Sequence, residues 1–358
     1  MSRPLAVILA VLAALPAVAG AQESEEVRLG RIYARRLEAQ YRLVRDPAAV
    51  ARVGEVGRVV AAASGRPELP YTFAIVDLEP ANAISLPGGF IYVTRGLLEF
   101  VRSDHELAAV LAHEVAHAAR RHQMEMIRRS NEAAFWTLLV ALLTRDAALA
   151  QGAHLLSASL LSGYTRDLER DADLAAVDIL TRTPYTPVAV LTVLERLARD
   201  ERLRPPVNAG AFRDHPATAE RVASVLAELR RRGIPVVRRP AANYLRVGLR
   251  LAGEPGAEVA EILVNDVVVV RLTDPVRARA VVERLDRFFD TDPDPGQVAV
   301  LPAGPAAWEV VGGTRLLVTV TTADAAALGL PLADAARQVA ARLQWVIRED
   351  LRQRQFTG

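Results

Sequence analysis

Two histidines four residues apart, with a glutamate after the first, constrain this chain more than any other feature. Residues 110–122 read VLAHEVAHAARRH and hold three of the six histidines in the chain. Residues four apart on an α-helix lie on one face, so His113 and His117 can direct ring nitrogens at one ion. Glu114 is turned about 100° away on that helix. Its carboxylate then stands beside the ion, where it can take a proton from a zinc-bound water. The pattern predicts a catalytic zinc site.

The composition removes most other kinds of catalytic site. Neither lysine nor cysteine occurs, and all 44 basic residues are arginines. Schiff-base lysines, P-loop lysines, thiol nucleophiles, thiolate zinc sites and disulfides are therefore excluded. The arginines are spread among 42 acidic residues, and aromatic residues make up only 5% of the chain. We therefore expect no nucleic-acid partner.

The first residues have the pattern of an export signal. Arg3 precedes an apolar run over residues 5–18, and the small residues 19–21 supply a cleavage site. The apolar run is short for a membrane anchor, which is the alternative interpretation. We expect residues 1–21 to be a cleaved signal peptide and the mature protein to be periplasmic or otherwise exported.

Hydrophobic periodicity predicts helices around a small sheet. Helical spacing runs over residues 27–60, residues 71–77 alternate as a strand, and residues 82–93 read as two short strands around a turn. Ser103 and Glu106 form a capping box that starts the helix bearing the two histidines.

The rest of the chain divides near residue 235. Two apolar runs, residues 133–143 and 147–163, are each short for a membrane span. They predict buried helices or a helical pair in peripheral contact with a membrane. The glycine and prolines of GIPVVRRPAANY, which begins at Gly233, mark a boundary. We expect one domain over residues 22–235 and a C-terminal α/β module of unknown role over residues 236–358.

A catalytic zinc site with two histidines needs a third protein ligand and an open position. A metzincin would have a histidine where this chain has Gln123. His122 is about 140° from His117 on a continuous helix, which favours a surface or capping hydrogen bond. Glu169 and Asp173 lie one turn apart on a predicted acidic helix. One of them can bind the metal while the other accepts a hydrogen bond from a ligand histidine; Asp171 and Asp178 read as solvated charges.

Four motifs resemble one family of zinc metallopeptidases. The motifs are NAISLPGGFIYVTRGLL, DHELAAVLAHEVAHAARRH, YTRDLERDADLAA and DHPATAERV, in that order between residues 27 and 229. Together with the pattern HEVAH…ERDAD they resemble the gluzincins that include the CaaX prenyl proteases, HtpX and the periplasmic BepA-like proteases. The resemblance implies a mostly α-helical, zincin-like metallopeptidase domain with a small β-sheet.

The same resemblance implies roles for individual residues. It implies one zinc ion per chain, with Glu169 as its third ligand and Asp173 as the partner of a ligand. It places His215 near the metal, where it either stabilises the substrate oxyanion or blocks the open position at rest. Arg221 belongs to the same motif as His215.

Substrate-binding candidates come from the predicted hairpin. We hypothesise that the strand at residues 90–93 is a free edge above the zinc, to which a substrate peptide adds as another strand. Asn82, Gly89, Phe90 and Tyr92 are the candidates on this hypothesis.

Two functions compete at this stage. The first is an exported zinc endopeptidase that cleaves unfolded or misassembled envelope proteins in quality control. The second is a zinc-stabilised, chaperone-like binding protein whose peptidase site is idle or covered by the protein itself. Glu114 favours the first, because a binding protein has no need of a base at that position.

Overall fold

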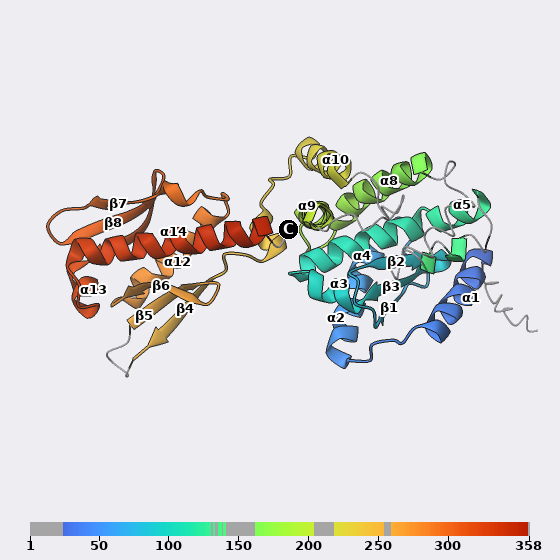
Figure 1. Ribbon diagram of the computed structural model, residues 1–358, viewed down its shortest axis with the longest axis horizontal. Coiled ribbons are helices and arrows are strands. Elements are labelled where there is room, and N and C mark those ends of the chain that lie inside the picture. Colours follow the sequence, from blue (N-terminus) through green and yellow to red (C-terminus); the bar gives the residue numbers. More distant parts are fainter. Residues whose placement is uncertain are drawn as a thin grey trace, which may run out of the picture.

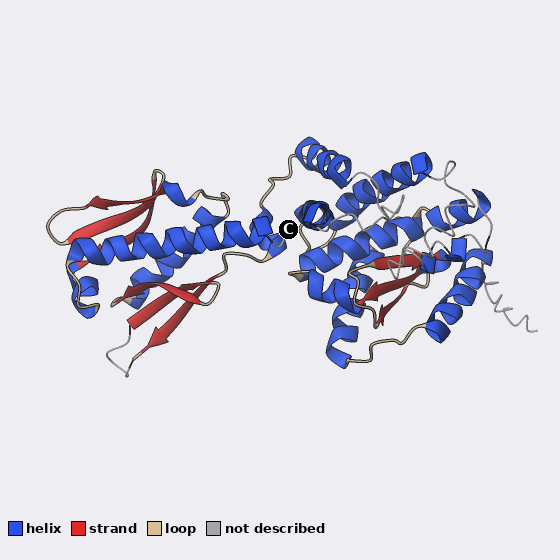
Figure 2. Cartoon of the chain, viewed as in Figure 1, coloured by secondary structure: helices blue, strands red, loops and turns tan. Residues whose placement is uncertain are grey.

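The computed structural model describes residues 24–129, 132, 135–137, 139–140, 162–203, 218–253 and 259–356. The predicted signal peptide and His215 lie outside the described residues, as does most of the two apolar runs. In the described part of the chain, no helix has the length and hydropathy needed to cross a membrane. Helices dominate, with small three-stranded sheets (Figure 2), which confirms the predicted fold class.

The first sheet has its strands in the order β1-β3-β2, where β1 is Thr72–Val76, β2 is Ala83–Leu86 and β3 is Phe90–Thr94. The hairpin of β2 and β3 was predicted, and the short 3-10 turn η1 (Pro87–Gly89) joins them. Gly88 has a φ of 76°, and a Cβ there would lie 2.6 Å from the Cα of Val27, so only glycine fits this turn.

The prediction that β3 is a free edge is wrong. Strand β1 pairs with it in parallel, from Thr72 opposite Phe90 to Val76 opposite Thr94. Strand β3 therefore has neighbours on both sides, and a substrate peptide cannot add to it. The strands at the edges of this sheet are β1 and β2.

Helices enclose this sheet and fill the first hydrophobic core. The predicted helix over residues 27–60 is two helices, because Asp46 caps a new one and Pro47 begins it. Helix α4 has Leu107, Leu111 and Val115 fully buried. It contacts β2 on one side and α8 on another (Figure 1). The helices that the structure describes in this region are α1 (Glu25–Gln40), α2 (Pro47–Ala62), α3 (Arg95–Phe100), α4 (Asp104–Ala119), α5 (His122–Arg129), α8 (Ser162–Leu180), α9 (Val188–Leu203) and α10 (Thr218–Arg231).

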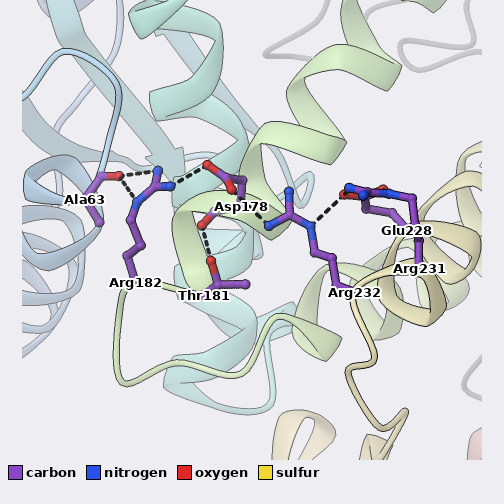
Figure 3. A network of polar contacts seen from close by, with 7 residues as sticks. All are labelled: Ala63, Asp178, Thr181, Arg182, Glu228, Arg231 and Arg232. Atoms are coloured by element: carbon purple, nitrogen blue, oxygen red, sulfur yellow. Dashed lines mark hydrogen bonds and ion pairs between the residues drawn. The ribbon is translucent and has the colours of Figure 1, made fainter.

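A polar network fixes the C-terminal end of α8, beyond Glu169 and Asp173 (Figure 3). Arg182 donates to the carbonyl oxygen of Ala63 at the end of α2 and to Asp178 on α8. Arg232 donates to Asp178 and to Glu228 on α10. Asp178 is therefore bonded to two arginines rather than merely solvated, and α2, α8 and α10 are held together at one end.

The C-terminal region repeats one simple arrangement, an antiparallel three-stranded sheet followed by helix. Helices α12 and α14 each contact both sheets, so they form the centre of a second hydrophobic cluster. Helix α11 (Arg238–Ala242) precedes this region. The elements are β4 (Val247–Ala252), β5 (Val259–Val264), β6 (Val267–Leu272), α12 (Pro275–Phe289), η2 (Pro295–Gln297), β7 (Val298–Pro302), β8 (Ala307–Gly312), β9 (Arg315–Thr321), α13 (Thr322–Ala327) and α14 (Leu332–Phe356).

Candidate functional site

The start of α4 is fixed by contacts that differ in part from the predicted capping box. The Ser103 hydroxyl accepts from the Glu106 backbone N–H at 3.2 Å, which confirms the N-cap. The Glu106 carboxylate accepts instead from the backbone N–H of Arg102 at 2.8 Å, one residue before the cap. Glu106 is fully buried, and it also binds Arg196 and Thr192 of α9. The helix that bears the two histidines is therefore anchored to α9.

Three side chains from α4 and α8 bring their ligand atoms together. One ring nitrogen of His113, one of His117 and one carboxylate oxygen of Glu169 lie within 4.8 Å of one another. The Nε2 atoms of the two histidines are 3.0 Å apart. The Glu169 oxygens lie 3.3 Å from Nε2 of His113 and 3.4 Å from Nε2 of His117. His113 and Glu169 are buried. A cluster of this kind attracts a cation, since its donors converge in a region of low dielectric.

Asp173 and Arg221 complete the buried charge around His113. The Asp173 carboxylate lies 3.0 Å from His113 Nδ1, and Arg221 donates to both Asp173 oxygens at 2.7 Å. Arg221 also lies 3.1 Å from Glu169. Burial alone raises the pKa of Asp173, but the charge and hydrogen bonds of Arg221 outweigh it and hold that pKa below its usual range. Asp173 is thus an anion that orients His113.

The electrostatics around His113 favour a positive charge at this position. Burial lowers the pKa of His113, but the neighbouring Glu169 and Asp173 carboxylates raise it to about 10. The metal-free site therefore holds a proton there at neutral pH. A metal ion has to displace that proton in order to bind.

His122 contacts His117, the second histidine of the cluster. The sequence analysis did not predict this contact. His122 is 6% exposed, and its Nδ1 lies 2.9 Å from Nδ1 of His117. The expectation of a surface or capping contact assumed a continuous helix. Instead α4 ends at Ala119, with Arg120 as its C-cap, and Arg121 has a φ of 59°, so α5 turns His122 back against His117.

The hydrogen bonds of His122 set the tautomer of His117. Burial, followed by the charge of His117, lowers the pKa of His122 to about 4, so its ring is neutral at neutral pH. Its Nε2 lies 3.2 Å from Asp171, which also binds Arg120. If Nε2 donates to Asp171, then Nδ1 of His122 accepts from Nδ1 of His117. This leaves the Nε2 lone pair of His117 free to face the ligand cluster, where Nε2 of His113 is 3.0 Å away. Asp171 is thus part of the site rather than only a solvated charge.

Glu114 is buried and lines a pocket together with His113, Asp173 and Arg221. Of the four substrate-binding candidates, Asn82 lines this pocket. The other three lie elsewhere. Tyr92 is 2% exposed in the core, with its hydroxyl 2.7 Å from Glu38. Phe90 packs on the cluster around Tyr33, and Gly89 lies against Tyr71.

The sequence profile of peptidase family M48 matches residues 47–229. The beta-barrel assembly-enhancing protease of Yersinia pestis is 28% identical over 248 residues, covering 65% of this chain and 50% of that protein. The protein of the same name from Escherichia coli K12 is 26% identical over 193 residues, 51% of this chain and 40% of that protein. The mitochondrial metalloendopeptidase OMA1 of Schizosaccharomyces pombe is 30% identical over 173 residues, 48% of this chain and 51% of that protein.

The chain therefore spans about half of these relatives or less. The matched residues 47–229 contain α4 with both histidines, the Glu169 and Asp173 pair on α8, and Arg221 on α10. They make up just over half of the 358 residues. On this match, the chain belongs to peptidase family M48.

Proposed function

We propose that this protein is a zinc-dependent endopeptidase. The observation that carries the proposal is the convergence of His113, His117 and Glu169, whose ligand atoms lie within 4.8 Å of one another. Two imidazoles and one carboxylate form a ligand set that suits zinc and leaves a fourth position open. The outer nitrogen of each histidine faces a polar partner, Asp173 or His122. Such contacts orient the imidazoles for a metal.

Several residues of this chain have separate roles in the proposed hydrolysis. When bound, zinc supplies Lewis acidity, which makes water more acidic and polarises the scissile carbonyl. Glu114 accepts the proton of the attacking water and delivers it to the leaving amine. Asp173 and Arg221 hold His113 in place. His215 is proposed to donate a hydrogen bond to the oxyanion or, at rest, to occupy the open position.

The proposed substrates are unfolded or misassembled proteins of the cell envelope. Two observations support this choice, the signal-peptide pattern of residues 1–21 and the similarity to proteases named for beta-barrel assembly. The alternative is a chaperone-like binding protein with an idle or self-occluded site. The buried Glu114, which lines a pocket with His113, favours the peptidase, because a binding protein needs no base there. We further propose that residues 236–358 fold as a unit of their own, because residues 242–347 supply a separate hydrophobic cluster.

Metal analysis combined with a cleavage assay tests the proposal. The purified mature protein is expected to hold about one zinc ion per chain and to cleave casein. A chelator should abolish cleavage, and added zinc should restore it in wild type but not in Glu169→Ala. Because zinc competes with the proton on His113, zinc affinity should rise with pH up to about 10.

The possible outcomes separate the two functions. Full cleavage after the zinc has been stripped would refute the metal mechanism. Stoichiometric zinc without cleavage of casein or of any other unfolded protein would favour the binding protein. Tight zinc binding by Glu169→Ala would show that the third ligand is wrong.

A further inference from the structure

The two sheets of the C-terminal region have four edge strands, and side chains cap three of them. The edge strands are β4 and β6 of one sheet and β7 and β9 of the other (Figure 1). On three of these strands a helix side chain donates to a backbone carbonyl oxygen: Arg342 to Val268 on β6, Gln344 to Val298 on β7, and Arg277 to Thr319 on β9. Among the described residues, no side chain caps β4 in this way. An uncapped edge presents N–H and C=O groups to which another strand can add.

The ladder between β4 and β5 shows which backbone groups of β4 face the open edge. Asn265 donates its N–H to the carbonyl oxygen of Arg246, the residue directly before β4. In an antiparallel pair, every second residue bonds to the neighbouring strand. The register between β4 and β5 has no shift. Val247, Leu249 and Leu251 therefore direct their N–H and C=O groups at the open edge, and the residues between them bond to β5.

Leu249 and Leu251 also leave apolar surface uncovered at this edge. They lie opposite Ile262 and Ala260 of β5, which are both fully buried. Residues opposite each other in an antiparallel pair share a face, so both leucines belong to the core face of the sheet. Helix α12 contacts β4, but Leu249 is still 38% exposed and Leu251 is 51% exposed. A strand added at this edge would place side chains beside the two leucines and bury apolar surface.

The opposite face of the sheet is positively charged beside β4. Arg250 and Arg271 both bind Glu261, so two guanidinium groups share one carboxylate. The side chain of Arg250 is 60% exposed. An acidic side chain on this face of an added strand would be attracted to Arg250, and a basic one would be repelled. Two copies of β4 would bring their Arg250 side chains together on one face, so charge disfavours a second copy of this chain as the added strand.

We propose that β4 is a docking strand for an extended segment of unfolded polypeptide in which apolar residues alternate with acidic ones. The segment pairs with the backbone groups of Val247, Leu249 and Leu251, as in other cases of strand addition. Its apolar side chains pack on the two leucines, and its acidic side chains lie beside Arg250. The docking strand lies outside the residues 47–229 that match the peptidase family. The inference therefore does not rest on the peptidase function.

Peptide binding to the full-length mature protein tests the inference. Labelled peptides of about eight residues, long enough to pair along the whole of β4, are titrated by fluorescence anisotropy with a chelator present, so that no metal-dependent cleavage occurs. A peptide that alternates leucine with aspartate should bind about 10-fold more tightly than one that alternates leucine with arginine. It should exceed by a similar factor a peptide with the same leucines and aspartates in two blocks, which cannot place all its leucines on one face. Bound peptide should slow hydrogen exchange at the amides of Leu249 and Leu251.

A pair of proline substitutions separates the docking strand from the other edges. Leu249→Pro removes an N–H that β5 does not use, and Gly248 before it accommodates the proline ring, so the sheet should stay folded. Affinity for the aspartate peptide should fall about 10-fold or more. Val300→Pro on β7 is the matched control, and it should leave the affinity unchanged. Gln297 accepts from the N–H of Gly313, so Val300 also faces an open edge by the same alternation.

A charge substitution tests the same site without altering the backbone. Arg250→Gln should reduce the preference for the aspartate peptide over the arginine peptide, a result that does not depend on the folding of Leu249→Pro. Melting temperatures establish which variants are folded.

Several outcomes would overturn the docking strand. They are equal affinity for the alternating and block peptides, slowed exchange only outside β4, wild-type affinity in folded Leu249→Pro, or an unchanged charge preference in Arg250→Gln. Sedimentation that shows a dimer, which Leu249→Pro dissociates, would also overturn it, because the occupant would then be a second copy of this chain. None of these results bears on the peptidase function, which casein cleavage tests separately.

Discussion

Buried charges are arranged differently in the two regions of this molecule. Around the candidate metal site, among the described residues, the carboxylates of Glu114, Glu169 and Asp173 are buried with the single guanidinium of Arg221. The carboxylates are in excess, and the electrostatics of the cluster draw a proton onto His113 at neutral pH. An arrangement of this kind is costly to bury unless a further cation balances it.

In the C-terminal region two buried carboxylates, Glu261 and Asp324, are balanced by partners within the fold. Glu261 on β5 accepts from Arg250 at 3.0 Å and from Arg271 at 2.9 Å, across both neighbouring strands. Asp324 accepts from the backbone N–H groups of Thr273 and Thr321, both at 2.9 Å. It also accepts from their hydroxyls and from the guanidinium of Arg277.

The comparison distinguishes buried carboxylates that stabilise the fold from buried carboxylates that bind a cation. Asp324 ties the end of one sheet to the start of α13, and its charge is fully compensated there. The carboxylates near His113 are left with an excess of negative charge. We attribute the first arrangement to fold stability and the second to the binding of a cation, and the two regions should therefore respond to mutation in opposite ways.

Removing a compensated carboxylate should produce the largest loss of stability. Asp324→Ala leaves Arg277 and four donors without their shared acceptor, and should cost about 3 kcal/mol of the free energy of unfolding of this region. Denaturant titration followed by tryptophan fluorescence measures the loss. Casein cleavage by the folded fraction should stay at the wild-type level, because residues 236–358 are proposed to fold separately.

Removing Glu169 from the carboxylate-rich cluster should act on the metal more than on the fold. Glu169→Gln should abolish zinc binding and cleavage, yet lower the unfolding free energy of the metal-free protein by less than Asp324→Ala does. Asp173 still neutralises Arg221 in this variant. A destabilisation as large as that of Asp324→Ala would break the distinction between the two regions.

A smaller effect is expected at His122, which binds no metal itself in this account. His122→Phe keeps a ring against His117 but removes its hydrogen-bond acceptor, so zinc affinity should fall about 10- to 100-fold. Chelator competition measures the affinity. His105→Phe is the control, since His105 lies at the start of α4 against Tyr185 and Thr186. Equal zinc affinity in both variants would assign His122 to packing alone.

Local patterns in the sequence predicted much of the fold. The periodicity, the turn at Gly88 and the cap at Ser103 identified the helical stretch over residues 27–60, the hairpin and the start of α4, but not the break that divides this stretch into α1 and α2. The spacing of the His113 and His117 pair depends only on helix geometry, which explains why it could be recognised at once. The acidic helix suggested Glu169 and Asp173 as a pair, and the resemblance to a family assigned their separate roles and added Arg221.

Contacts between distant segments escaped the sequence analysis. The sequence of neither strand indicates that β1 pairs with β3, so β3 was predicted to be an edge strand of the sheet. The turn at Arg121 needs a left-handed conformation from an ordinary residue, and without it His122 cannot be placed. Glu106 read as a local cap, although its ion-pair partner Arg196 is 90 residues away. The pocket likewise exists only because α9 packs against α4.

The most direct test of the central claim is the variant Glu114→Gln, compared with wild type for zinc content and casein cleavage in one experiment. Glutamine has the same shape and leaves His113, His117 and Glu169 in place. The account predicts an unchanged zinc content of about one ion per chain and a rate of cleavage lower by several orders of magnitude, because glutamine cannot accept the proton. Cleavage at the wild-type rate by the zinc-loaded variant would contradict it.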